Sequence, residues 1–125
     1  MPNEKDLRKK MIAHIRELPN AWAIATHQGP HSPSVGEPDI IACIEGIMLQ
    51  VEVKLPGNKP TPSQTKAIRR WRRTGAVAGW ANCMEHLDEL LTLVPLVRHD
   101  TQIVWPNELM PGYEGTTNAQ AQGQN

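Results

Sequence analysis

A stretch of nineteen residues, GEPDIIACIEGIMLQVEVK from Gly36 to Lys54, limits what this chain can fold into more than any other feature. Its two halves, 39–44 and 47–54, are rich in apolar and β-branched residues that suit strands. Glu45-Gly46 between them suits a tight two-residue turn. The stretch therefore predicts a β-hairpin.

The hairpin carries three charged side chains at the end away from its turn. Counting outward from the turn places Asp39 opposite Glu52 on the neighbouring strand. Because side chains alternate along a strand, Asp39, Glu52 and Lys54 fall on the same face. The other face is uniformly apolar and consists of Ile40, Ala42, Ile44, Ile47, Leu49, Val51 and Val53.

Two facing carboxylates need a counter-charge, since like charges about 4 Å apart repel by about 4 kcal/mol at an effective dielectric of 20. A lysine offsets part of this, and an edge salt bridge is the interpretation that the acid-x-lysine triplet alone favours. Two carboxylates with backbone carbonyls nearby also form an oxygen-rich site suited to Mg²⁺ or Mn²⁺. Such an ion polarises a phosphoryl oxygen and lowers the pKa of a bound water, so this second interpretation predicts phosphodiester hydrolysis.

The rest of the chain predicts helices and two further strands around the hairpin. Asn3 and Thr61 suit helix N-caps, Asn82 begins a third capping pattern, and Pro19, Gly75 and Pro95 mark the helix ends. The expected order is a helix over 4–18, a strand over 20–26, the hairpin, a helix over 62–74, a strand over 76–81 and a helix over 83–95. This order indicates an α/β fold with a central mixed β-sheet flanked by helices.

Several residues outside the hairpin favour the metal site over the salt bridge. Glu4 lies on the inward stripe of the first helix, and Gln64 lies at the start of the second helix, whose surface is basic. That helix exposes Lys66, Arg69, Arg70, Arg72 and Arg73, which suit either phosphate contacts or a solvated face. The tryptophans Trp22, Trp71 and Trp80 are expected in the core. His27 and His31 lack further ligands for zinc.

Length and charge limit the remaining possibilities. With 125 residues we expect one domain over 1–110, including an edge strand over 101–106, and a polar, disordered tail over 111–125. Because 13 basic residues balance 13 acidic ones, a nucleic-acid surface would be a local patch. No signal core or membrane-length segment is recognisable, which predicts a cytoplasmic protein without a membrane partner.

The motif order resembles the PD-(D/E)XK nuclease superfamily and, in detail, its virus-type replication-repair nuclease (VRR-NUC) domain. "GEPD" and "VEVK" correspond to the family's G-x-P-D and E-V-K, "PGNKPTPSQ" to its next loop and helix start, and "RRTGAVAGWANCMEHLDELL" to its closing strand and helix. The resemblance spans roughly Glu4 to Leu91. It implies a restriction-endonuclease-like core. Glu37 departs from the pattern, which has a neutral residue between the glycine and the proline.

The resemblance also implies roles for individual residues. Asp39, Glu52 and the backbone carbonyl of Val53 would hold Mg²⁺ or Mn²⁺, and Lys54 would be the catalytic lysine. Glu4 would complete the site directly or through water, with Gln64 as a supporting polar residue. The residues expected to contact DNA are Lys59, Lys66, Arg69, Arg70 and Arg73.

The function implied is a structure-selective endonuclease that cuts branched DNA such as four-way (Holliday) junctions, in a homodimer of bacterial or phage origin. Three alternatives stay open. The chain could be a flap nuclease or duplex-nicking nuclease, a non-catalytic DNA-binding module of nuclease fold, or a small subunit that needs a partner for activity.

Overall fold

The computed structural model describes residues 3–26 and 36–98 of the chain. In chain order the elements are α1 (Glu4–Arg16), β1 (Ala21–Ala25), β2 (Ile40–Ile44), β3 (Ile47–Val53), α2 (Pro62–Arg73), β4 (Val77–Ala81), α3 (Met84–Leu91) and α4 (Val94–Arg98). His27, His31, the expected edge strand over 101–106 and the tail over 111–125 lie outside the described residues.

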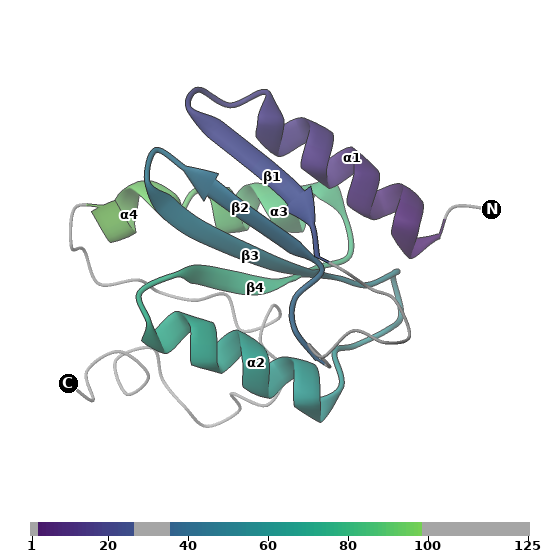
Figure 1. Ribbon diagram of the computed structural model, residues 1–125. Helices are drawn as coiled ribbons and strands as arrows, with labels where there is room; N and C mark the ends of the chain where they lie inside the picture. Colours follow the sequence, from purple (N-terminus) through teal and green to yellow (C-terminus); the bar gives the residue numbers. More distant parts are fainter. Residues whose placement is uncertain (1–2, 27–35, 99–125) are drawn as a thin grey trace.

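The four strands form one mixed sheet in the order β1-β2-β3-β4 (Figure 1). β1, β2 and β3 pair antiparallel, whereas β4 runs parallel to β3. The register predicted for the hairpin is confirmed, since Ile40 pairs with Val51 and Ile44 pairs with Ile47. Glu45 (φ 51°) and Gly46 (φ 87°) both have positive φ, as a type I′ hairpin turn requires.

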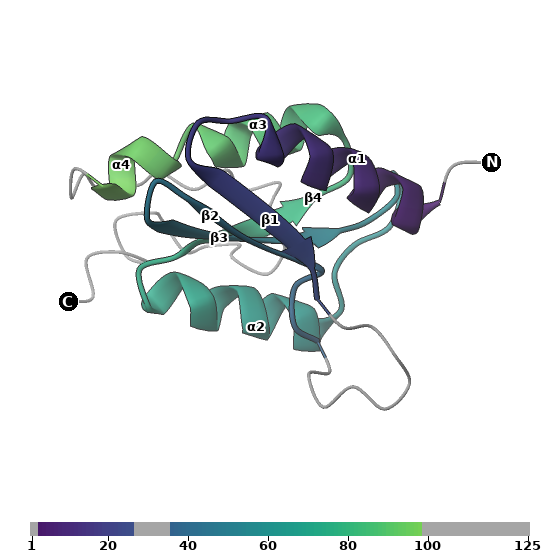
Figure 2. The same cartoon turned by 45° about the horizontal axis from the view of Figure 1, so that its top comes forward.

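The sheet lies between two layers of helices. Among the helices of residues 3–26 and 36–98, α1, α3 and α4 cover one face and α2 covers the other (Figure 2). The apolar face of the hairpin is buried in the core as predicted, with only Ile47 half-buried. The largest fully buried apolar side chains are Met11, Ile15, Ile40, Leu49, Ile68, Leu87, Leu90 and Val51. The predicted α/β architecture, a mixed sheet flanked by helices, is therefore confirmed.

α2 begins with a complete capping box. The Thr61 side chain accepts a hydrogen bond from the Gln64 backbone N–H (3.1 Å), and the Gln64 side chain accepts one from the Thr61 backbone N–H (2.9 Å). Pro62 occupies the first helical position, where its missing N–H has no intrahelical partner to lose. The local sequence thus fixes where this helix starts, directly after the loop that follows the hairpin.

We expect Thr61→Ala to lower the free energy of unfolding by about 1 kcal/mol, because it leaves an N-terminal N–H of α2 without its side-chain acceptor. Urea denaturation of the variant and of Thr61→Ser measures the difference. The serine variant keeps a hydroxyl acceptor and should remain close to the wild type. Equal losses in both variants would contradict the capping role.

The C-terminal helices differ from the expectation. The N-cap of α3 is Cys83 rather than Asn82, and no side chain caps it. The Asn82 backbone N–H instead donates to Nδ1 of His86 (3.4 Å). The helix predicted to reach Pro95 ends at Leu91, and Pro95 is the second residue of a separate helix, α4. Proline is tolerated there because first-turn N–H groups have no intrahelical partners.

The expectation of three core tryptophans is wrong for Trp22. Trp80 is buried and Trp71 packs half-buried against the core, but Trp22 is 60% exposed. Its strand lies beyond the part of the sheet that α2 covers (Figure 2). Ile24 and Met48 are also exposed, and strand alternation and pairing place them on the same face as Trp22. We call Trp22, Ile24 and Met48 the open face.

Two arginines donate hydrogen bonds to β1 and β4, the outer strands of the sheet within residues 3–26 and 36–98. Arg16 Nε donates to the Ala23 carbonyl of β1 (2.9 Å), and its guanidinium lies 3.9 Å from the ring centroid of Trp22. Arg72 Nε donates to the Ala78 carbonyl of β4 (2.7 Å). Arg72 was expected on the exposed surface of its helix; it is half-buried because it reaches the sheet. None of the helices in the described ranges is both long and apolar enough to cross a membrane.

Candidate active site

Asp39 lies directly before β2, and its backbone carbonyl and one of its side-chain oxygens accept hydrogen bonds from the neighbouring strands. Its Oδ2 accepts a hydrogen bond from the Val53 backbone N–H on β3 (2.9 Å). Its carbonyl accepts one from the Thr26 backbone N–H after β1 (2.8 Å). These contacts fix the carboxylate at the end of the hairpin opposite the turn, as the predicted register requires.

Glu52 occupies the next-to-last position of β3 and is buried, with 2% of its surface exposed. Its pKa is raised to about 9, mainly by burial and then by the negative charge and hydrogen bonding of Asp39. Lys54 lowers this pKa, whereas the negative charge of Glu4 adds to the rise. No hydrogen-bond partner for Glu52 Oε1 lies within the described residues. The site is therefore short of positive charge around a buried acid.

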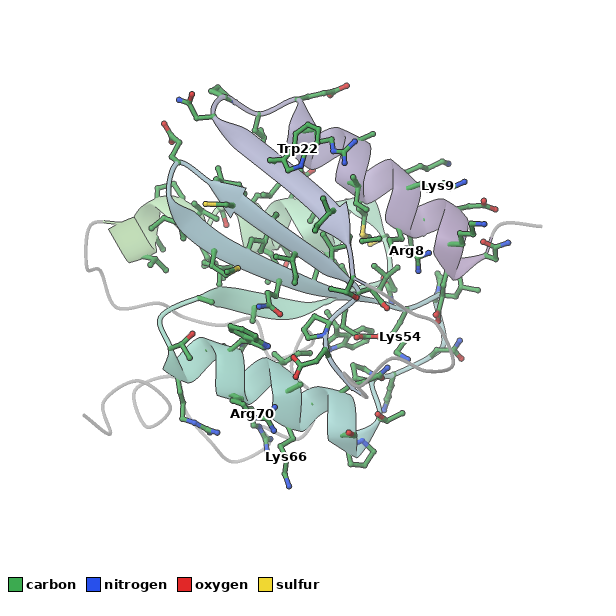
Figure 3. The ribbon with its side chains drawn as sticks, in the orientation of Figure 1. Arg8, Lys9, Trp22, Lys54, Lys66 and Arg70 are labelled. Atoms are coloured by element: carbon green, nitrogen blue, oxygen red, sulfur yellow. The ribbon has the colours of Figure 1, made fainter. Side chains whose placement is uncertain are left out.

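Lys54 follows β3 and remains next to this acid. Its Nζ lies 3.8 Å from Glu52 Oε2, and its side chain is 13% exposed. Its backbone N–H donates to the Ala81 carbonyl of β4 (3.0 Å), which anchors the residue at the sheet end. In Figure 3 the labelled Lys54 lies where the strands end, between α1 and α2. The ammonium group is thus held near the pair of acids.

Glu4 is the first residue of α1 and is half-buried. Its charge acts on Glu52, which agrees with the predicted inward orientation. Over the described parts of the chain, no group of three or more His, Cys, Asp or Glu side chains is placed to hold a metal ion together. Any ion would therefore depend on Asp39, Glu52 and backbone or water oxygens, with Glu4 acting at longer range.

The donor chemistry of this pair fits a hard divalent cation. Carboxylate oxygens are the ligands that Mg²⁺ and Mn²⁺ prefer, and Mg²⁺ usually keeps several of its waters, so two carboxylates suffice. The buried and unpartnered Glu52 Oε1 offers a lone pair that lacks a donor in the described structure. A cation there would also offset the burial and the repulsion from Asp39 that raise the Glu52 pKa.

The other residues expected at the site are distributed along α2 and the loop before it. Gln64 is half-buried, and its side-chain oxygen is engaged in the capping box. Lys59, Lys66, Arg70 and Arg73 are exposed, whereas Arg69 is half-buried. Figure 3 shows Lys66 and Arg70 on α2, with Lys66 pointing away from the sheet. The basic helix therefore presents most of its cations to solvent and not as ligands of the acid pair.

Two residues have surroundings that the sequence did not indicate. Glu37, an acid with no expected partner, contacts α2: its Oε1 accepts from Trp71 Nε1 (2.7 Å) and its Oε2 lies 3.5 Å from Arg70 Nη1. Gln50, on the same face of β3 as Glu52, is 1% exposed, and its Nε2 has no partner in the described ranges. The one hint in the sequence for Glu37 is that a half-buried tryptophan needs an acceptor for its indole N–H.

Comparison with known proteins gives a likeness of fold. No family model matches the chain, and no curated protein matches it. Among solved structures, a chain described as "VRR_NUC domain" is similar, with a TM-score of 0.58 and 24% sequence identity. The match covers 71% of this chain and 94% of that chain. The chain thus has a VRR-NUC-like fold, as its motif order predicts.

Proposed function

We propose that this protein is a Mg²⁺- or Mn²⁺-dependent endonuclease that hydrolyses phosphodiester bonds in branched DNA. The observation that supports it most is the pairing of Asp39 with a buried Glu52 whose Oε1 has no partner in the described structure and whose ammonium neighbour is Lys54. An acid pair with one buried member costs stability, and a bound cation offsets that cost. The VRR-NUC-like fold agrees with the proposal.

The residues would divide the work as follows. Asp39, Glu52 and the Val53 carbonyl would hold the cation, which would supply a water of lowered pKa and charge neutralisation at the phosphate. To bind, Glu52 must release the proton that burial favours, so cation binding and deprotonation are coupled. Lys54 would orient the attacking water or stabilise negative charge on the phosphate. Glu4 would act through water.

The substrate side of the proposal rests on α2. Lys66, Arg70 and Arg73 are exposed on α2, and Arg70 lies 3.5 Å from Glu37, two residues before Asp39. Such cations position a nucleic acid through its phosphates without reading its sequence. Recognition through phosphates suits an enzyme that selects DNA by shape. Four-way junctions are the proposed substrate, and flaps or plain duplex the nearest alternatives.

The proposal is tested by incubating labelled four-way junction, flap and linear duplex DNA with the protein and Mg²⁺ or Mn²⁺. The wild type is expected to cut the junction best. Asp39→Asn is expected to lose about a thousandfold in rate, because it removes one of two charged ligands beside the reacting phosphate. Chelation should have the same effect as the substitution.

The matched control is Glu45→Gln, which makes the same loss of one negative charge at the exposed hairpin turn, away from the acid pair. It should cut like the wild type. If the wild type binds the junction but cuts no substrate under any of these conditions, the non-catalytic DNA-binding module or the partner-dependent subunit becomes the better explanation.

The open face supports the homodimer that we propose with this function. Trp22, Ile24 and Met48 are 60%, 47% and 38% exposed, and they are the large hydrophobic side chains left exposed in the described structure. Contiguous exposed apolar side chains on one face indicate an interaction surface. A second copy of the chain would bury it.

We expect Trp22→Glu to convert the dimer to a monomer, because it replaces the most exposed large apolar side chain of the open face with a charge. Sedimentation velocity over a range of protein concentrations measures the change. Lys10→Glu, a charge substitution on the exposed side of α1, is the control. A wild type that stays monomeric at high concentration would contradict the dimer and leave the cleavage proposal intact.

A further inference from the structure

Glu37 joins the segment that carries Asp39 to the basic helix α2. Both of its carboxylate oxygens are used: Oε1 accepts from Trp71 Nε1 at 2.7 Å, and Oε2 lies 3.5 Å from Arg70 Nη1. The Glu37 side chain is 28% exposed, so it lies partly between the two segments. An acid that simply faced solvent would not contact both Trp71 and Arg70 of α2.

The chain between Glu37 and Asp39 has little freedom. Pro38 is buried, its ring fixes φ, and its carbonyl accepts from Thr26 Oγ1 (3.0 Å). Before it, Gly36 has φ 86°, and a Cβ at this position would lie 2.6 Å from Ser63 Oγ in the first turn of α2. The segment is therefore held against α2 before Glu37, at Gly36, and against the end of β1 after it, at Pro38.

Arg70 has a second possible partner in the proposed function. It is 54% exposed and lies on the helix proposed to contact DNA phosphates, yet in this structure it faces Glu37 at 3.5 Å. An arginine engaged by a carboxylate contributes less to phosphate binding than a free one, because part of its charge is already balanced. Glu37 therefore contacts a residue proposed to bind DNA and precedes by two positions a residue proposed to bind the cation.

We propose that Glu37 is a positioning residue: its hydrogen bond from Trp71 holds Asp39 in place for cation binding, and its ion pair restrains Arg70 from DNA. The inference rests on the proposed function and assigns a separate role to each of the two contacts that Glu37 makes. Removing the hydrogen bond weakens cation binding. Removing only the charge strengthens DNA binding. A residue that merely stabilises the fold would move both affinities in the same direction.

Four variants separate the two contacts. Glu37→Gln keeps an acceptor for Trp71 and loses the charge; Glu37→Leu loses both; Trp71→Phe keeps an aromatic ring and loses the N–H donor. The fourth, Glu37→Gln combined with Arg70→Gln, removes the arginine that the first variant releases. Glu45→Gln is the charge-matched control on the exposed turn.

The readouts are Mn²⁺ affinity by calorimetry without DNA, and affinity for a labelled four-way junction in the presence of a chelator. Glu37→Leu and Trp71→Phe should lose about tenfold in Mn²⁺ affinity, the usual effect of removing a group that orients a ligand. Glu37→Gln should keep Mn²⁺ affinity but bind the junction about threefold more tightly, with a salt dependence steeper by about one phosphate contact. The double variant should lose that gain.

Thermal unfolding of each variant shows whether it is folded, so that a lost affinity is not mistaken for a lost fold. Unchanged Mn²⁺ affinity in both Glu37→Leu and Trp71→Phe would overturn the positioning role. A junction affinity that does not rise in Glu37→Gln would overturn the restraint on Arg70. A wild type that binds no Mn²⁺ would reject the proposed function itself, which the other two outcomes leave standing.

Discussion

Replacing Lys54 with methionine is expected to slow junction cleavage by about a hundredfold or more, the usual effect of losing a charged group that acts in the transition state. The lysine ammonium lies 3.8 Å from Glu52 Oε2 in a largely buried setting, where no solvent cation replaces it readily. Methionine keeps the length of an unbranched side chain and removes the charge. Because Asp39 and Glu52 remain, Mn²⁺ binding should persist, which distinguishes this variant from Asp39→Asn.

Single-turnover cleavage of the junction and calorimetric titration with Mn²⁺ measure the two properties separately. Lys10→Met, the same substitution at an exposed position of α1, is the control and should change neither. Cleavage at the wild-type rate by Lys54→Met would show that this lysine has no part in the reaction. Loss of Mn²⁺ binding together with cleavage would assign it to the assembly of the site instead.

Replacing Glu52 with glutamine is expected to stabilise the metal-free protein at pH 8 by an amount on the order of a few kcal/mol. Burial beside Asp39 raises the pKa of Glu52 in the folded state to about 9 from an ordinary value of 4.5. Between these two values the unfolded chain loses the proton and the folded chain keeps it. The free energy of unfolding therefore falls as the pH rises from about 4.5 to about 9, and is unaffected by this group below that range.

The test is urea denaturation of the wild type and Glu52→Gln in chelator from pH 5 to pH 9. The difference between their free energies of unfolding should grow with pH, because Glu52 titrates only in the wild type and all other titrating groups are common to both. Mn²⁺ at pH 8 should then stabilise the wild type and leave Glu52→Gln nearly unchanged, since only the wild type keeps both charged ligands. A difference that stays constant with pH would mean that Glu52 titrates normally in the fold.

The acid pair was predictable from sequence because two local rules determine it. Apolar alternation and the Glu45-Gly46 turn leave one register for the hairpin, and that register alone brings Asp39 and Glu52 together. The start of α2 was predictable for the same kind of reason, since its capping box lies within four consecutive residues. Features encoded over a few neighbouring positions need no tertiary information.

The missed features depend on contacts between distant segments. Trp22 is a large apolar residue in a strand and was therefore expected in the core. Its exposure follows from α2 covering a different part of the sheet. Glu37 and Trp71 are 34 positions apart, and nothing in either local pattern pairs them. The break between α3 and α4 likewise depends on how the chain packs after Leu91, where the apolar period continues.

The arginines on β1 and β4 limit how this sheet can grow. In the antiparallel and parallel pairings of the two strands, the Ala23 and Ala78 carbonyls point away from the neighbouring strand, and each accepts an arginine N–H. An incoming strand would have to displace a charged side chain on either flank before it could form a ladder, which disfavours amyloid-like extension. The dimer that we propose would therefore form through the open face instead of through a strand edge, and an assembly closed in this way would stop at a finite size instead of continuing as a fibre.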